Sequence, residues 1–150
     1  MDAVTYPNMG VISFFEKNMV AVRIPSGNKS LMTKFNINWT PTLVTLDSNG
    51  KEHHRTVGFM PPDEIVPSLL LGIAKSCFET EQFAEAIKHI KMLLDVYSES
   101  DAAPEATFLL GVCRYKDTHN PAHLKEAYEQ LSNKYPESEW TKRADPYRLL

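Results

Sequence analysis

The sequence has no apolar run that approaches the roughly 20 residues needed to span a bilayer. Its first residues, MDAVTYPNMG, have neither the basic segment nor the apolar core of a secretion signal. Charge of one sign is not concentrated anywhere, since 16 basic residues are offset by 19 acidic ones for a net charge of −3. We therefore expect a cytoplasmic protein that binds neither membranes nor nucleic acid.

Cysteine is scarce as well, because the chain holds only Cys77 and Cys113, which are far apart and form no CxxC motif. Both lie at core-facing positions of helical patterns, where free cysteine is commonly buried. A thiolate that attacks a disulfide must be exposed and have a low pKa. We therefore expect both cysteines to be inert in a reducing compartment, and we expect no catalytic residue in this chain.

The histidines do not have the spacing of a metal site. His53 and His54 are adjacent on an expected strand, so their side chains should point to opposite faces and cannot chelate one ion. His119 and His123 are four residues apart, but Pro121 interrupts the segment and no third ligand is evident. The sequence therefore predicts neither a metal site nor a cofactor, and it contains no evident hydrolytic triad.

What the first part of the sequence does contain is an alternation of short helical and strand-like patterns. Residues 11–18 have the pattern of a short helix, and residues 19–24, MVAVRI, form a compact apolar run typical of a buried strand. Residues 26–37 show near-helical apolar spacing behind a Ser/Gly/Asn turn. These patterns predict a helix, a strand and a second helix in that order.

The next segment, WTPTLVTLDSNGKEHHRTVGF at residues 39–59, predicts a β-hairpin. Residues 43–46 are apolar or β-branched, residues 47–50 have turn chemistry, and residues 51–59 return as a polar strand. Pro41 cannot donate to a sheet ladder, so it should mark the entrance of the first strand. An X-Pro bond can be cis at a cost of about 0.5–1 kcal/mol, and these residues alone leave the isomer open.

After Pro61 the strand signals end and helical patterns continue to the carboxyl terminus. The prolines and acids of PPDEIVPS suit a helix amino terminus, and Pro67 places the start of the helix proper near itself rather than at Asp63. LLDVYSES at residues 93–100 and LSNKYPES at residues 131–138 share the same spacing of Leu, Tyr, Glu and Ser. A helical hairpin therefore repeats, and such units bury their apolar faces by stacking into an array.

The segment IAKSCFETEQFAEAIKHIKMLL resembles a tetratricopeptide repeat. The small and large positions of that repeat fall on Ala74, Phe83, Ala86, Ile90 and Leu93. Gly111 in FLLGVCRYK resembles the small residue of the next repeat, while extra residues in KDTHNPAH depart from the pattern. The resemblance covers residues 68–150 and implies antiparallel helices with close contacts at Ala86 and Gly111.

The segment FNINWTPTLVTLDSNGKEHHRTVGF resembles the carboxyl-terminal part of a thioredoxin domain, from the helix before its cis-proline to the glycine ahead of its last helix. The resemblance implies that the Thr40–Pro41 bond is cis. It also implies that Trp39, Thr40 and Pro41 bind an extended peptide beside the backbone of Thr40. Redox-active members of that family have a central strand that leads into a CxxC motif, and this sequence contains neither.

Two interpretations of function therefore stay open. The first is a protein-interaction module, in which a redox-silent thioredoxin-like platform at residues 1–66 precedes a tetratricopeptide-like array at residues 67–150, and both bind extended or helical segments of a partner protein. The second is the carboxyl-terminal part of a thiol-disulfide oxidoreductase whose CxxC lies upstream of Met1. MDAVTYPN resembles the segment after the CxxC motif in such proteins, which favours an internal methionine or an early cut at Met1 over a natural redox-silent relative.

For the chain as given we favour the interaction module and expect no enzyme activity. The expected fold class is α+β followed by α, namely a partial thioredoxin-like sheet with flanking helices and then an all-α array of helical hairpins. Without a central strand, residues 19–24 and 43–46 lose their neighbour and leave strand edges unpaired, which favours aggregation or pairing with another chain. We therefore expect homo-oligomers that form through these edges, and the alternative is a rearranged sheet that joins the two strands directly.

Overall fold

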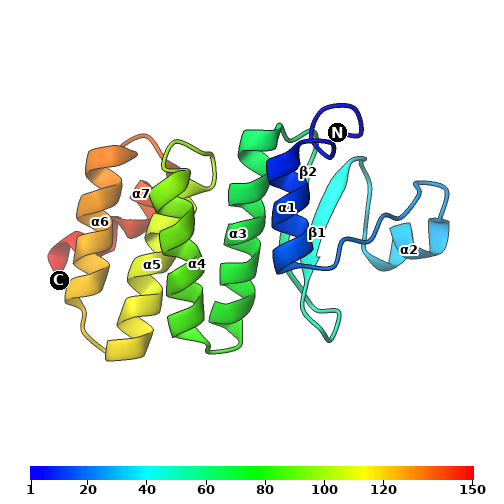
Figure 1. The fold of residues 1–150 in the computed structure, drawn as a ribbon. Coiled ribbons are helices and arrows are strands. Elements are labelled where there is room, and N and C mark those ends of the chain that lie inside the picture. Colours follow the sequence, from blue (N-terminus) through cyan, green and yellow to red (C-terminus); the bar gives the residue numbers. More distant parts are fainter.

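The computed structural model describes all residues from 1 to 150, and it consists of a small sheet followed by a row of helices (Figure 1). The elements of the first part are α1 (Met9–Asn18), α2 (Lys29–Lys34), β1 (Thr42–Leu46) and β2 (Glu52–Val57). The second part consists of α3 (Pro62–Glu79), α4 (Phe83–Val96), α5 (Ala103–Thr118), α6 (Ala122–Lys134), α7 (Glu139–Ala144) and the 3-10 helix η1 (Asp145–Leu149). An α+β region followed by helices is therefore the observed fold class.

The predicted hairpin is confirmed, and it forms a two-stranded antiparallel sheet in which Thr42 lies opposite Val57. The turn is stabilised by Asp47, whose Oδ1 accepts hydrogen bonds from the backbone N–H groups of Asn49 at 2.8 Å and Lys51 at 2.9 Å. The register shifts after Thr45, so that one residue of β2 has no partner on β1. This β-bulge determines where the two histidines of β2 lie.

The predicted strand at residues 19–24 is wrong. None of the backbone hydrogen bonds of the chain involves residues 20–24, and the side chains of Val20 and Val22 are 91% and 75% exposed. A strand exists only where a neighbour satisfies its backbone groups, and β1 pairs with β2 alone. The apolar run therefore has the composition of a strand without a partner in this chain.

The predicted helix at residues 26–37 is shorter than expected and consists only of α2. This helix packs closely on no other helix or strand. It is held from its carboxyl end, where the Arg55 guanidinium donates to the carbonyl oxygens of Phe35 at 2.6 Å and Asn36 at 3.2 Å. No residue of this helix is fully buried, so the helix covers only the six residues that Asn28 caps at the amino end.

The helix α3 begins at Pro62 and contains Pro67, so the prediction that it starts near Pro67 is wrong. The proline removes one backbone donor, but the turn ahead of it is anchored by Ile65 and Val66, which are only 0% and 6% exposed. Glu64 adds a tertiary contact, because its Oε2 accepts the backbone N–H of Asp101 at 3.0 Å. Burial and this hydrogen bond outweigh the local effect of the proline.

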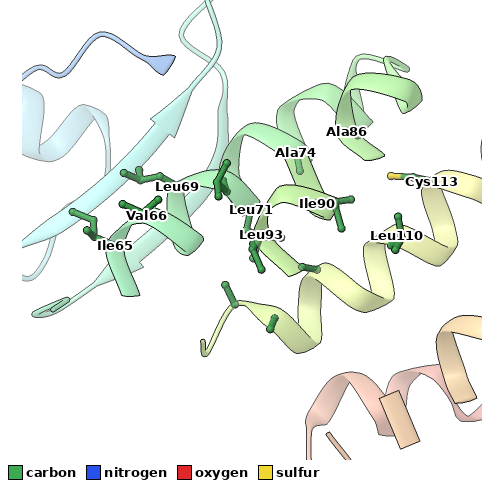
Figure 2. Packing of buried hydrophobic residues seen from close by; sticks show 14 of the residues in the cluster. Ile65, Val66, Leu69, Leu71, Ala74, Ala86, Ile90, Leu93, Leu110 and Cys113 are labelled. Carbon is green, nitrogen blue, oxygen red and sulfur yellow. The ribbon is translucent and has the colours of Figure 1, made fainter. Parts of the chain in front are cut away.

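The core lies on both sides of α3, which packs on the two strands as well as on α4 and α5. Figure 2 shows Ile65, Val66 and Leu69 next to the strands, and Ala74 facing α4. On the sheet side the approach is close, since a Cβ at Gly72 would lie 2.8 Å from the Thr45 hydroxyl oxygen. The helix crosses the expected domain boundary between residues 66 and 67, and that boundary stays a prediction.

The helices from α3 to α6 form a row in which each packs on its neighbour (Figure 1). The predicted close contacts at two small residues are confirmed. Ala86 is fully buried, and a Cβ at Gly111 would meet the Cβ of Ala127 and lie 2.9 Å from the carbonyl oxygen of His123. A larger residue at either position would therefore push neighbouring helices apart.

Candidate functional site

The predicted peptide-binding residues Trp39, Thr40 and Pro41 form the corner between α2 and β1, and the Thr40–Pro41 bond is cis, as the resemblance implied. The corner is tied to the end of β2, because the Gly58 N–H donates to the Pro41 carbonyl oxygen at 2.8 Å. A local hydrogen bond also stabilises the corner, because the Thr42 hydroxyl donates to the Trp39 carbonyl oxygen at 2.7 Å. The backbone N–H and C=O of Thr40 make no hydrogen bond within the chain.

Three large apolar residues at the corner or at the end of β2 have exposed side chains. Trp39, Val57 and Phe59 are 68%, 57% and 60% exposed. The hydrogen bond from Gly58 to Pro41 places the end of β2 beside the corner, so the three residues are close along the backbone. We call residues 39–41 and 57–59 the Pro41 corner. It combines unpaired backbone groups with apolar area, which is the chemistry that an extended peptide requires.

The two histidines of β2 both contact α3, so the prediction that they point to opposite faces is wrong. His53 Nε2 lies 3.1 Å from Asp47 Oδ2, and its Nδ1 lies 3.1 Å from Glu79 Oε2 in a contact that is poorly aligned for a hydrogen bond. His54 Nε2 lies 3.1 Å from the Ser68 hydroxyl oxygen. The bulge adds one residue to β2 and thereby cancels the alternation of the strand.

The environment of His54 changes its chemistry. Burial lowers the pKa of this imidazole to about 4, and the positive charge of Lys75 acts in the same direction. The Lys75 ammonium lies 3.4 Å from His54 Nδ1 and is also paired with the carboxylate of Glu105. His54 is therefore a neutral, hydrogen-bonded group at pH 7. Within the whole chain no three His, Cys, Asp or Glu side chains are grouped as metal ligands.

The two cysteines lie on α3 and α5, and both are free thiols. Burial, followed by the charge of Cys77, raises the pKa of the Cys113 thiol to about 12. Burial, followed by the charge of Glu85, also raises the pKa of the Cys77 thiol. Both groups are therefore protonated at neutral pH, which is the reverse of what a disulfide-attacking thiol needs.

A cleft, which no sequence pattern indicated, lies between α4, α5 and α6. This cleft has a volume of about 290 Å³, and its lining includes three cations and one acid: Lys91, Arg114, Lys134 and Asp95. Lys91 and Lys134 have no carboxylate partner, whereas Arg114 lies 3.7 Å from Glu126. The Tyr135 hydroxyl donates to the Ser98 carbonyl oxygen at 2.7 Å beside the cleft. The cations come from three separate helices, so their proximity depends on packing and leaves no signal in the sequence.

Comparison with known families supports the resemblance to a thioredoxin domain. Residues 8–72 match a family model described as a thioredoxin-like domain, and this range runs from the start of α1 into α3. The match supports a thioredoxin-like domain in this part of the chain. No curated protein and no solved structure matches the chain. Judged by length and hydropathy, none of the helices qualifies as a membrane span.

Proposed function

We propose that this chain is a protein-interaction module and that its thioredoxin-like part binds an extended peptide at the Pro41 corner. The observation that carries the proposal is the free backbone N–H and C=O of Thr40 in a corner that also exposes Trp39, Val57 and Phe59. An extended peptide pairs its own backbone with such groups and places alternate side chains on the apolar area around them. Trp39 is the natural anchor, because buried aromatic side chains carry a large share of binding energy at interfaces.

The helices α3 to α6 act in this proposal as a tetratricopeptide-like array with a second binding surface. The close contacts at Ala86 and Gly111 support the repeat alignment. The cleft between α4, α5 and α6 supports the second surface, since its three cations outnumber Asp95, and Lys91 and Lys134 form no ion pair within the chain. An acidic segment of the partner fits this cleft by charge.

The same proposal assigns no enzymatic role to the chain. Thiol-disulfide exchange needs a thiolate that is exposed and has a resolving thiol close by. Burial keeps both Cys77 and Cys113 protonated, and Cys113 has no exposed surface. Binding without chemistry is therefore the function that the geometry supports best.

The experiment is a selection of linear peptides from a random display library against the whole chain, followed by titration of the selected peptides. Trp39→Ala should weaken binding at least tenfold, and Val57→Lys should do the same, because each removes apolar area from the Pro41 corner. Val96→Lys is the matched control, since Val96 is 65% exposed on α4, outside the corner.

Backbone amide NMR locates the bound peptide independently of the variants. The largest shifts should fall on the amides of Thr40, Thr42 and Gly58. Binding that shifts Lys91 and Lys134 instead, and that weakens steeply with salt, would assign the peptide to the cleft. Selected peptides that bind wild type and Trp39→Ala equally, with no shift at the corner, would refute peptide binding there.

A further inference from the structure

The strand β1 is paired on one side only. The Gly58 N–H bonds to the Pro41 carbonyl, which makes position 41 a hydrogen-bonded position of the antiparallel pair. Such positions alternate, so Leu43 and Thr45 also bond to β2, whereas the N–H and C=O groups of Thr42 and Val44 point away from it. No other backbone group of the chain bonds to these two residues. One edge of β1 is therefore free.

Residues 20–24, which we call the unpaired segment, also lack backbone hydrogen-bond partners. Their backbone groups bond to nothing in the chain. Val20, Val22 and Ile24 alternate with Ala21 and Arg23, and their exposed fractions are 91%, 75% and 40%. In an extended conformation these three side chains form one apolar face, as in a strand that is buried on one side. The segment has everything that a strand needs except a neighbour.

The helices next to the sheet provide cover for a further strand. α1 packs on α3 but on neither strand, whereas α3 packs on both (Figure 1). Neighbouring helices lie about 8–10 Å apart, and neighbouring strands lie about 4.8 Å apart. Each helix is therefore about as wide as two strands, so two helices side by side can cover more than two strands. Phe14 and Phe15 of α1 are only partly buried in the present arrangement. A strand added to the sheet would therefore gain apolar contacts as well as hydrogen bonds.

We propose that the free edge of β1 accepts the unpaired segment of a second copy of this chain, so that two copies exchange the segment and form a symmetric dimer. Each copy carries one donor and one acceptor, and a reciprocal exchange uses both and leaves no open end. Residues 20–30 are exposed throughout, and the following helix α2 packs on no other element, so the segment moves without disturbing the core. Pairing β1 with β1 of the second copy would leave the three apolar side chains uncovered.

The test begins with the mass of the whole chain by sedimentation velocity, from about 1 to about 200 µM, a range over which mass action reveals a weak dimer. Wild type should shift from monomer to dimer with concentration. Val22→Lys should raise the dimer dissociation constant at least tenfold, because it places a charge on the buried face. Val96→Lys is the control and should leave the constant unchanged, since that valine is exposed on α4.

A second variant tests the acceptor edge. Val44→Pro removes only an N–H that points away from β2, so the hairpin keeps its own ladder while the dimer is lost. Val44→Thr keeps the donor and the strand propensity and should dimerise like wild type. A synthetic peptide of residues 19–25, MVAVRIP, should bind the monomeric Val22→Lys chain and should not bind that chain when Val44→Pro is added.

Isotope-filtered NMR of a mixture of differently labelled copies then identifies the contact. Nuclear Overhauser effects between the unpaired segment of one copy and β1 of the other are expected. A wild-type chain that stays monomeric at every concentration overturns the proposal. So does a dimer that tolerates Val22→Lys and shows contacts from β1 to β1 of the other copy. The monomeric Val22→Lys chain should still bind the selected peptides at the Pro41 corner, which separates loss of the dimer from loss of peptide binding.

Discussion

His54 links the stability of this fold to pH. In the folded chain burial lowers the pKa of its imidazole to about 4, from an ordinary value of 6.5. The perturbation of interest is acidification from pH 7 to pH 5, where carboxylates stay largely ionised and histidines take up protons. Because the unfolded chain binds a proton at His54 that the folded chain refuses, the free energy of unfolding should fall as the pH falls from 6.5 to 4.

The size of the effect is set by the two pKa values. A shift of one pKa unit corresponds to about 1.4 kcal/mol, so the two values for His54 imply a full effect of about 3 kcal/mol, reached below pH 4. Between pH 7 and pH 5 the expected loss is about 2 kcal/mol. This is an upper value, since water reaches part of the ring and screens its charge. Burial also lowers the pKa of His89, which adds a loss of the same sign.

The assay is urea unfolding followed by circular dichroism at pH 7, 6 and 5. His54→Gln should be less pH-dependent than wild type by most of that loss, because its amide does not titrate and still reaches the Ser68 hydroxyl. Val96→Ala, at an exposed position of α4, is the control and should keep the wild-type slope. If His54→Gln loses as much stability as wild type between pH 7 and pH 5, the reasoning is refuted.

Three further predictions concern two close helix contacts and the two buried cysteines. Gly111→Ala should lower the free energy of unfolding, because overpacking costs about 1–3 kcal/mol while the gain in helix propensity is about 1 kcal/mol. Adding Ala127→Gly should restore part of that loss, and a single variant more stable than wild type would contradict the close contact. Ala86→Leu should cost about 1–3 kcal/mol in thermal unfolding, and an unchanged Tm would count against the repeat alignment. In a disulfide-reduction assay with a thiol donor, the chain should show no turnover above background, whereas turnover that disappears in Cys77→Ser or Cys113→Ser would overturn the binding role.

Local patterns predicted the elements whose neighbours are close in sequence. The hairpin is indicated by β-branched residues on either side of a turn, and the helices from α3 onward are indicated by apolar spacing. The strand expected at residues 19–24 failed because its composition says nothing about whether a neighbour exists. The predicted start of α3 was wrong for a related reason. The rule about Pro67 considers only the neighbouring residues, whereas Ile65 is buried by tertiary contacts.

The residues of the candidate site also differ in how far the sequence alone could predict them. Trp39, Thr40 and Pro41 are consecutive, so a resemblance in one segment was enough to single them out. Val57 and Phe59 join them only because the register of the hairpin places the end of β2 beside Pro41. The cleft between α4, α5 and α6 depends on three helices at once, and the orientation of the histidines depends on a single bulged residue.

The helix α3 packs on the hairpin with one face and on α4 with another. Ser68, Gly72 and Lys75 of this helix contact the hairpin, while Ala74 faces α4. Neither half therefore opens without exposing a face that the other half needs, and amide hydrogen exchange in β2 and α4 is expected to proceed through the same opening. Dividing the chain after residue 66 would cut α3 itself, because this helix spans Pro62–Glu79. A peptide held at the Pro41 corner would slow exchange in helices that it never touches.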